Sequence, residues 1–217
     1  MNVQQAYNVW AENYDTVSNK TRDVEARALR ETFSQKGIQK HPLTINVLEI
    51  GCGTGKNTEW LLTKAKHLIA ADFSSEMLAK AKEKITAENV GFRQMDMREK
   101  WVFDDAEFDL ITCSLALEHI ENIGYVFQEA QRVLRGGGQF YVGELHPFKQ
   151  YLGTKARFDT ENGVFELECF VHHISDFSEA AAQNGFHFIE IKEWFDDDDR
   201  NNIPRILTML FKKNEQS

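Results

Sequence analysis

The sequence has little cysteine and little proline, and each shortage excludes a class of protein. Its 217 residues include three cysteines and three prolines. Cys52, Cys113 and Cys169 are odd in number, widely separated and without a CxxC pair, which argues against a disulfide framework or a zinc knuckle. We expect reduced thiols in the cytoplasm, each a small buried hydrophobic residue. With few prolines and no linker-like segment, residues 1–217 are expected to form one domain.

Long apolar runs and an excess of positive charge are also absent. No run approaches the roughly 18 apolar residues that a membrane span requires, and residues 1–10 lack the basic and apolar regions of a signal peptide. The formal net charge is −9, so a polyanion such as nucleic acid would be repelled on average. The chain is nevertheless 42% hydrophobic, which is enough to build a core. The expected partner is a small molecule, with no nucleic acid and no membrane.

From residue 46 onward, short apolar runs alternate with amphipathic segments, as is typical of strands alternating with helices. Residues 1–36 are expected to be helical, because Tyr7, Trp10 and Tyr14 recur at helical spacing. Strands joined through helices indicate right-handed crossovers and a parallel sheet covered on both faces. The predicted strands are 46–50, 67–71, 90–95, 108–113 and 138–143, and the predicted helices lie near 56–64, 75–85 and 124–134.

The alternation ends near the C-terminus. Asp176 followed by Glu179, and then Asn184-Gly185, predict a short helix with a capping box and a glycine stop. Two strand-like runs follow, 186–195 and 203–212, with only a polar stretch between them. Because parallel neighbours need a crossover of about a dozen residues or more, these two strands should be antiparallel.

A glycine loop separates the first predicted strand from the helix after it. The segment reads Val-Leu-Glu-Ile-Gly-Cys-Gly-Thr-Gly, with glycines at Gly51, Gly53 and Gly55. Glycine lets the backbone approach a bulky ligand and adopt positive φ, and ligands of open α/β sheets bind at the carboxyl ends of strands. A tight turn without a ligand is the alternative, although three alternating glycines exceed what a turn requires.

The residues around this loop indicate which ligand it holds. A dinucleotide loop has the spacing GxGxxG, whereas Lys56 stands here at the third glycine position. Glu49, just before the loop, would repel a pyrophosphate and attract a cationic amino-acid group. Asp72, at the end of the second strand, can accept hydrogen bonds from ribose hydroxyls. It can also cap the next helix, and the two roles are compatible.

Four motifs follow one another along the chain: Glu49-x-Gly51-x-Gly53-x-Gly55, Asp72-Phe73-Ser74-x-x-Met77-Leu78, Met95-Asp96-Met97 and Phe108-Asp109-Leu110-Ile111. In this order and spacing they resemble the Rossmann-like S-adenosylmethionine-dependent methyltransferases, and among these the small-molecule group of ubiquinone and menaquinone methylases. The resemblance covers about residues 5–145. It implies an α/β three-layer sandwich around a seven-stranded, mostly parallel sheet whose last strand is antiparallel, in agreement with the C-terminal strand pair.

We therefore expect four segments within the domain. They are a helical cap over 1–40, a cofactor-binding core over 45–145, a hairpin lid over 146–175, and a helix with an antiparallel strand pair over 176–217.

The resemblance also implies S-adenosylmethionine as the cofactor and S-adenosylhomocysteine as its product. Glu49 and the three loop glycines would lie near the methionine moiety. Asp72 would bind the ribose, and Phe73 and Met77 would flank the adenine.

Further residues complete the implied cofactor site. Asp96 would accept a hydrogen bond from the adenine amino group, with Met97 beside it. Ser114 and Leu115 would line the methionine end. Tyr14 resembles the aromatic residue that covers the bound cofactor in such proteins, and its alternative is an ordinary place in the helical aromatic stripe.

Methyl transfer is an in-line displacement at a sulfonium carbon, so the protein mainly aligns the nucleophile and excludes water. A base is needed only if the nucleophile carries a proton that must leave early. The candidate catalytic residues are His119, after the fourth strand, and His146, beyond the fifth. For His119 the alternative is packing or loop capping. Pro147 restricts His146 to extended backbone.

Residues 149–175 are expected to form a hairpin that begins near Arg157, turns at Asn162-Gly163 and returns over 164–171. Many relatives carry a lid over the acceptor site at this point of the chain. A plain strand with exposed polar groups is the alternative. The candidate residues for shaping an acceptor pocket are Tyr151, Arg157 and His173.

Two sets of polar residues are not assigned to chemistry. His146, His172 and His173 lack metal-binding spacing, so no metal site is predicted. The acidic run 196–199 is interpreted as a solvated turn, with a cation site or a basic partner as the alternative.

These features predict an enzyme that moves a methyl group from S-adenosylmethionine to O, N or C of a small molecule. A non-catalytic partner subunit that keeps the cofactor pocket is one alternative. A nicotinamide-dependent oxidoreductase is another. Two features disfavour it: Lys56 in place of the last glycine of GxGxxG, and the carboxylate of Glu49.

Overall fold

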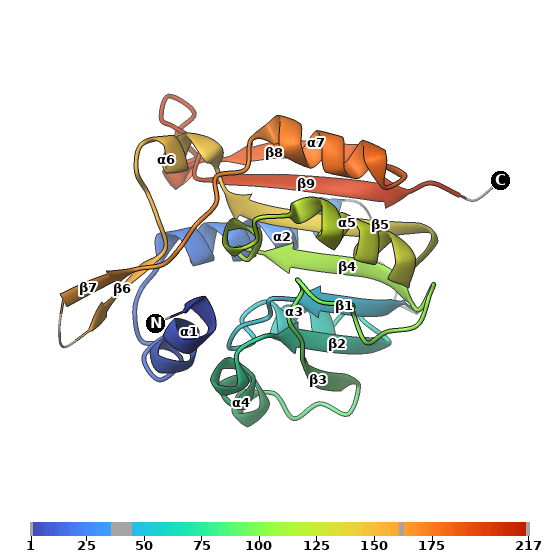
Figure 1. Cartoon of the computed structure of the whole chain (residues 1–217), viewed down its shortest axis with the longest axis horizontal. Coiled ribbons are helices and arrows are strands. Elements are labelled where there is room, and N and C mark those ends of the chain that lie inside the picture. Colours follow the sequence, from blue (N-terminus) through green and yellow to red (C-terminus); the bar gives the residue numbers. More distant parts are fainter. Residues whose placement is uncertain (1, 36–44, 161–162, 216–217) are drawn as a thin grey trace.

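The computed structural model describes residues 2–35, 45–160 and 163–215. Its main strands are β1 (Asn46–Ile50), β2 (His67–Asp72), β3 (Val90–Gln94), β4 (Phe108–Ser114), β5 (Leu134–Leu145), β8 (Phe186–Trp194) and β9 (Ile206–Lys213). They form one seven-stranded sheet in the order β3-β2-β1-β4-β5-β9-β8 (Figure 1). Among these strands β9 alone runs against the others, and it pairs antiparallel with both β5 and β8. The predicted mostly parallel sheet with an antiparallel last strand is confirmed.

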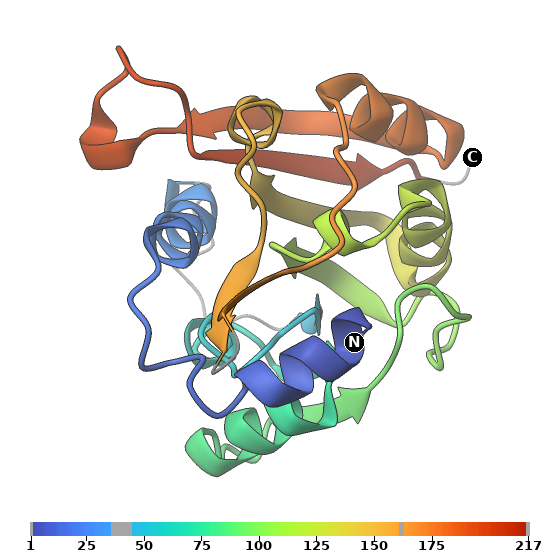
Figure 2. The same cartoon turned by 60° about the vertical axis from the view of Figure 1, so that its left-hand side comes forward.

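Helices cover both faces of this sheet (Figures 1 and 2). They are α1 (Val3–Trp10), α2 (Lys20–Gln35), α3 (Thr58–Leu62), α4 (Ser75–Lys84), α5 (Ile123–Val133), α6 (Pro147–Tyr151) and α7 (Ile174–Gln183), with 3-10 turns η2 (Leu117–His119) and η3 (Asp196–Asp198). Strand β1 shows how two layers arise, because Val47 packs with Phe33 of α2 whereas its neighbour Leu48 packs with Val126 of α5. Side chains alternate across a strand, so an apolar run such as β1 is buried on both faces.

The carboxyl ends of β1, β2 and β4 lie at the same edge of the sheet, on the side of α1 (Figure 1). This follows from parallel pairing, because β1 pairs in parallel with β2 on one side and with β4 on the other. The segments that follow these three strands carry most of the residues predicted to bind a ligand. No helix in the described part of the chain is long and apolar enough to cross a bilayer.

A two-stranded hairpin, β6 (Arg157–Thr160) and β7 (Gly163–Glu166), lies beside α1 in both ribbon views (Figures 1 and 2). Thr160 pairs with Gly163. Asn162, the other residue of the predicted turn, lies outside the described residues. The second strand ends at Glu166 and does not extend to Val171 as predicted. Leu167 N still donates to the Ala156 carbonyl at 2.9 Å, but beyond it the chain leaves the hairpin, because Phe170 N donates to the Glu118 carbonyl instead.

Helix α7 begins earlier than the sequence suggested. Asp176 was expected to open the capping box with Glu179, but the structure places His173 at the N-cap and Asp176 inside the first turn. The Asp176 carboxylate accepts a hydrogen bond from the backbone N–H of His173 at 2.7 Å. Asp176 therefore occupies the N3 position of the capping box, and the prediction that Asp176 is its first residue is wrong.

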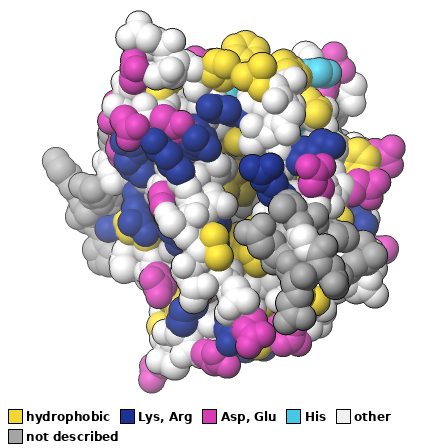
Figure 3. Space-filling model, turned by 90° about the vertical axis from the view of Figure 1, so that its left-hand side faces the viewer, with side chains coloured by type: hydrophobic (Ala, Val, Ile, Leu, Met, Phe, Trp, Pro, Cys, Tyr) yellow, Lys and Arg dark blue, Asp and Glu magenta, His cyan; other side chains and the backbone are white. Residues whose placement is uncertain are grey.

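The acidic run 196–199 forms ion pairs with α2 and with Arg205. Asp197 lies 2.9 Å from Lys20 Nζ and Asp198 lies 3.0 Å from Arg27 Nη2, and both partners belong to α2. Asp196 accepts from Arg205 Nη2 at 2.6 Å. Figure 3 shows basic and acidic side chains side by side on this side of the molecule. Asp197 and Asp198 are exposed, so the run is a solvated turn as predicted, and its ion pairs with α2 were not predicted.

Candidate active site

A cleft lies at the carboxyl edge of β1, β2 and β4, and its empty space, including the part open to solvent, is about 1060 Å³. Its walls come from the loops after these strands and from the N-terminal helices. Gly55 is the one predicted cofactor residue that does not line it. The others are Tyr14, Glu49, Gly51, Gly53, Asp72, Phe73, Met77, Asp96, Met97, Ser114 and Leu115.

The glycines of the loop have two different tasks. Gly55 has φ +88°, and a Cβ there would lie 2.7 Å from Ile85 Cδ1 and 3.4 Å from Ala81 Cβ. Gly55 is thus required for close packing of the loop against the end of α4. Gly53 has φ +54°, and a Cβ there would meet nothing within 4 Å, because this glycine borders the open cleft.

Asp72 ties the glycine loop to the end of β2. Its Oδ2 accepts from the Gly53 N–H at 2.8 Å and its Oδ1 accepts from the Ser74 N–H at 2.9 Å. Burial raises the pKa of Asp72 to about 6 despite these bonds. The N-cap of α4 is Ser74, whose hydroxyl accepts from Met77 N, so Asp72 does not itself cap the helix.

Glu49 is a buried carboxyl at the bottom of the cleft, with 5% of its surface exposed. It accepts a hydrogen bond from the Thr58 hydroxyl at 2.6 Å. Burial, together with the nearby acids Glu25 and Asp72, raises its pKa to about 8 although the Thr58 hydrogen bond acts the other way.

A second buried acid, Glu25 of α2, lines the same cleft. It accepts hydrogen bonds from Ser114 Oγ at 2.6 Å, Asn57 Nδ2 at 2.8 Å and Tyr141 Oη at 3.1 Å. Burial still raises its pKa. Neither Glu25 nor Glu49 forms a salt bridge within the described residues, so this end of the cleft suits a cationic ligand.

Sequence reasoning did not find Glu25 or its partner Asn57. A signal was present, because Glu25 stands beside Val24 and one helical turn before Ala28 and Leu29, on the apolar stripe of α2. An acid on a buried helical face needs hydrogen bonds or a ligand, and such a position can be read from sequence.

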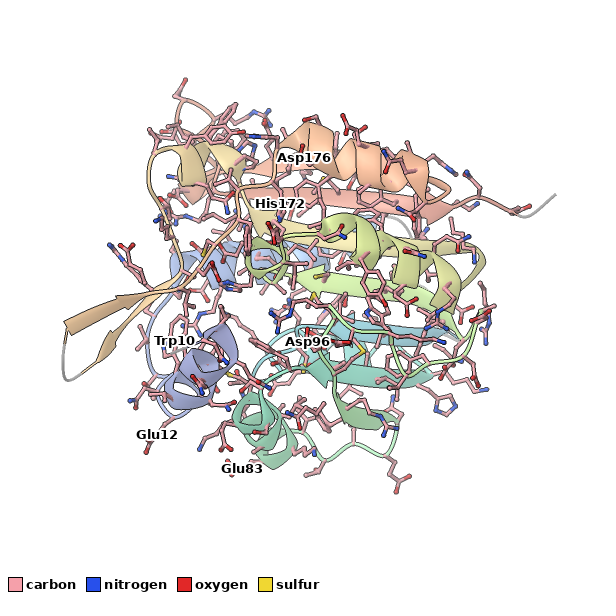
Figure 4. All side chains as sticks on the ribbon, viewed as in Figure 1. Trp10, Glu12, Glu83, Asp96, His172 and Asp176 are labelled. Atoms are coloured by element: carbon pink, nitrogen blue, oxygen red, sulfur yellow. The ribbon has the colours of Figure 1, made fainter. Side chains whose placement is uncertain are left out.

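Asp96 lies just beyond β3 and lines the cleft (Figure 4). It is paired with Arg98, whose Nη2 donates to its Oδ2 at 2.6 Å. The hydrogen bonds from Arg98 hold the pKa of Asp96 below its usual value, although partial burial acts the other way. Asp96 is therefore a negatively charged acceptor whose orientation is fixed by Arg98.

His119 lies in the cleft wall with both ring nitrogens engaged. Its Nδ1 is 2.9 Å from the Glu168 carbonyl oxygen, which can only accept, so Nδ1 carries the proton. Its Nε2 then accepts from the Tyr7 hydroxyl at 2.9 Å. Burial raises the pKa of Tyr7 well above its usual value, so this hydroxyl stays protonated.

His146 does not line the cleft. It is fully buried at the N-cap of α6, where its Nδ1 accepts from Phe148 N at 3.2 Å and its Nε2 donates to Glu193 at 3.2 Å. Burial lowers its pKa. Its backbone is extended, at φ −60° and ψ 134°, as the following proline predicts. The structure thus gives His146 a capping role.

The predicted acceptor residues are separated. Tyr151 and His173 are hydrogen-bonded to each other at 2.6 Å on the surface, whereas Arg157 lines a second cavity beside the cleft. His172 is buried and donates from Nε2 to the Ile120 carbonyl at 2.7 Å. Among the described residues no three His, Cys, Asp or Glu side chains are arranged to hold a metal ion.

Comparisons with known proteins agree with this site and fold. Residues 48–142 match the family model described as a methyltransferase domain. The chain is 31% identical over 148 residues to a demethylmenaquinone methyltransferase of Lactiplantibacillus plantarum, covering 64% of this chain and 60% of that protein. It spans less than two thirds of the length of the curated relatives that it matches first.

Solved structures share the fold. A DhpI–SAH complex superposes with a TM-score of 0.75 at 21% identity, covering 98% of this chain and 96% of that one. A putative S-adenosylmethionine-dependent methyltransferase of Listeria monocytogenes gives a TM-score of 0.71 at 20% identity, covering 87% of this chain and 100% of that one. Residues 48–142 thus match a methyltransferase domain, and the chain shares its Rossmann-like fold with solved structures of S-adenosylmethionine-dependent methyltransferases. The predicted resemblance to that family is confirmed.

Proposed function

We propose that this chain is an enzyme that binds S-adenosylmethionine in the cleft and methylates O, N or C of a small molecule. Bound there, the cofactor would supply a methyl group on a positively charged sulfur. The proposal extends to the whole chain what the matching domain indicates for residues 48–142. In it, residues 1–217 act as one domain, with the hairpin region 146–175 as a lid.

The observation that carries the proposal is the placement of acids at two neighbouring strand ends. Glu49 and Glu25 lie where the methionine end would sit, and their buried carboxyls gain from a cationic ammonium and sulfonium. Asp72, at the end of β2, lies where ribose hydroxyls can donate to it. A pyrophosphate beside Glu49 would be repelled, which disfavours a nicotinamide dinucleotide.

The remaining cleft residues would hold the adenine and exclude water. Phe73 and Met77 supply apolar faces, and Asp96 supplies a fixed acceptor for an amino group. Tyr14 would close the site from above, with the Arg22 guanidinium 4.0 Å from its ring centre.

The acceptor side is proposed to be small-molecule chemistry in the cytoplasm. The relative of Lactiplantibacillus plantarum is named for methylation of demethylmenaquinone, a small molecule. The cysteines Cys52, Cys113 and Cys169 are free thiols, which supports a reducing compartment. His119 is the histidine proposed to lie near the transferred methyl group, because it lines the cleft and is hydrogen-bonded to Tyr7, which lines it too.

Thermal melting in the presence of three ligands tests the proposal. A ligand at 100 times its Kd adds about 2.7 kcal/mol to the free energy of unfolding, which for a chain of this size raises Tm by about 5–10 °C. S-adenosylmethionine and S-adenosylhomocysteine should raise Tm, and NAD should not. A shift with NAD and none with either sulfur compound would overturn the proposal. Binding without turnover of any acceptor would favour the partner-subunit alternative.

A further inference from the structure

A second cavity adjoins the cofactor cleft, and we infer that it binds the methyl acceptor as a small anion that also carries an O–H or N–H group. This rests on the proposed function, since an acceptor exists only if the chain transfers a methyl group. Four residues line both cavities: Tyr7, Tyr14, Arg22 and Leu115. We call them the shared wall, and a cofactor in the cleft and an acceptor in the second cavity would lie on either side of it. The second cavity has about 770 Å³ of empty space, open solvent included, within the ordinary range for small-ligand sites.

The shared wall contains a strained residue. Leu115 has φ +53°, a left-handed conformation that is uncommon for a bulky residue. Its N–H donates to the Gly143 carbonyl at 2.8 Å, which holds the turn in place at the end of β4. Backbone strain of this kind is typical of ligand sites, and here it lies where the two cavities meet.

The charge of the second cavity is opposite to that of the whole chain. The chain carries a net charge of −9, yet three cations, Arg22, Lys155 and Arg157, and one acid, Glu118, line this cavity. Lys155 Nζ lies 3.8 Å from a carboxylate oxygen of Glu166, so Arg22 and Arg157 carry most of the positive charge. The Arg22 guanidinium donates to the carbonyls of Tyr14 and Val17, both at 2.7 Å, so these bonds leave its positive charge without a carboxylate. Its Nε is buried with no hydrogen-bond partner among the described residues. An anion would therefore be attracted here in spite of the overall negative charge.

A buried acid provides the second recognition element. Glu118 lines the second cavity with 8% of its surface exposed, and its Oε2 has no hydrogen-bond partner in the described part of the chain. Its segment is held firmly, because Phe170 N donates to the Glu118 carbonyl at 2.7 Å and Glu144 accepts from the N–H of Leu117 at 2.9 Å. A buried acceptor atom without a donor is costly, and an O–H or N–H of the bound molecule would satisfy it.

The aromatic side of the cavity suits an apolar body between these two polar ends. Trp10 belongs to α1 (Figure 4). Its ring centre lies 5.7 Å from that of Tyr7 and 4.8 Å from that of Tyr14, and all three residues line the cavity. Rings arranged in this way present both edges and faces to a planar ligand.

Three probes of nearly equal size separate the two recognition elements. 4-Hydroxybenzoate carries both the charge and the hydroxyl, its methyl ester lacks the charge, and 4-methoxybenzoate lacks the donor. Each is titrated by ligand-observed NMR against the full chain saturated with S-adenosylhomocysteine. We expect 4-hydroxybenzoate to bind about tenfold or more tightly than either analogue, since each lost bond involves a charged group.

Matched variants assign each preference to its residues. Glu118→Ala removes the acceptor and should abolish the preference for the hydroxyl over the methoxy probe, whereas Glu121→Ala, at an exposed acid nearby, should leave it unchanged. The double change Lys155→Ala and Arg157→Ala should abolish the preference for the acid over the ester, and Lys64→Ala should not.

Equal affinities for the three probes, no detectable binding of 4-hydroxybenzoate, or unchanged preferences in the cavity variants would each overturn the inference. The melting curve of the same samples keeps this apart from the proposed function. If S-adenosylhomocysteine raises Tm while the probes show no preference, the acceptor inference alone fails. If S-adenosylhomocysteine gives no shift, the proposed function fails first.

Discussion

The cofactor cleft and the second cavity share a wall, yet they are assembled in different ways. The cleft takes most of its lining from short segments that follow β1, β2, β3 and β4, all within residues 49–120. The second cavity joins α1, the start of α2, the turn after β4 and residues 154–157 before the hairpin. One is built locally at strand ends and the other by contacts between distant parts of the chain.

This difference also separates the part of the chain that matches the family model from the part outside that match. The family match covers residues 48–142, which includes the loops after four strands and omits α1, α2 and the hairpin region. A cofactor common to a family is bound by the same strand-end loops in each member, whereas each acceptor is bound by a cap and a lid of its own. The predictions below test this division, from the largest expected effect to the smallest.

Gly55→Ala should damage the fold, whereas Gly53→Ala should damage binding. At Gly55 the new Cβ meets Ile85 and Ala81, and with the positive φ we expect a loss of about 2–5 kcal/mol in the free energy of unfolding. At Gly53 the strain of φ alone costs about 1–2 kcal/mol, and the methyl group enters the cleft. Urea denaturation and cofactor titration of both variants measure the two effects. Equal stability losses would contradict the separate tasks.

Asp72→Ala should weaken the binding of S-adenosylhomocysteine by about 100-fold or more, since two hydrogen bonds to a charged carboxylate contribute about 1.5–3 kcal/mol each. Asp72→Asn should fall between this variant and the wild type, because it keeps an acceptor for the Gly53 N–H. Calorimetric titration gives the affinities. The 4-hydroxybenzoate preferences of the second cavity should survive in any variant that still saturates with cofactor. An unchanged cofactor affinity would refute the ribose role.

Affinity for S-adenosylmethionine should rise with pH through the ionisation of Glu49. Its pKa is about 8 without ligand, and a cation favours the ionised form, so binding lowers that pKa. From pH 6 to pH 7 the ionised fraction, and hence the affinity, should increase about tenfold, while an amino group stays protonated. Ionisation of Asp72, with a pKa of about 6, adds less than about twofold.

Glu49→Gln is the control for this pH dependence and should leave only the smaller Asp72 effect. The ligand-free chain should show the opposite trend in stability. Because the folded state keeps the Glu49 proton where an unfolded chain has lost it, the free energy of unfolding falls as pH rises from 4.5 to about 8. A pH profile of affinity identical in wild type and variant would contradict the account.

Removing the ion pairs between α2 and the acidic run should have the smallest effect. Lys20→Ala and Arg27→Ala each break an exposed pair, which contributes about 0.2–1 kcal/mol. Melting curves should show a slight decrease in Tm that disappears in about 1 M salt, where charges are screened. A decrease that persists in high salt would mean that packing, rather than charge, attaches α2 to this loop.

Local patterns were enough to predict many of the residues that line the cofactor cleft, although not Glu25 or Asn57. Glu49 and Asp72 were identified because they stand next to a strand end and a glycine loop, and the structure brings both to one cleft. The parallel pairing of the sheet followed from alternating strands and helices, and the antiparallel pair from the short connection between its strands.

The acceptor half depended on contacts that local patterns do not encode. His146 looked available after β5, but α6 folds back so that the histidine caps it in the core. Glu118 stands beside the candidate His119 in the sequence and was not singled out. Its burial depends on distant segments, such as the one around Phe170, whose N–H donates to the Glu118 carbonyl. The ion pairs of the solvated acidic run were not predicted, because the partners Lys20 and Arg27 lie far away in the sequence.

A crystal structure of the chain with S-adenosylhomocysteine tests the central claim most directly. We expect both ribose hydroxyls within hydrogen-bond distance of Asp72 and the amino group beside Glu49 or Glu25. The sulfur should face the shared wall formed by Leu115 and Tyr7, so that a methyl group on it would point to the second cavity. The ligand bound elsewhere, or its sulfur turned away from that wall, would contradict the account.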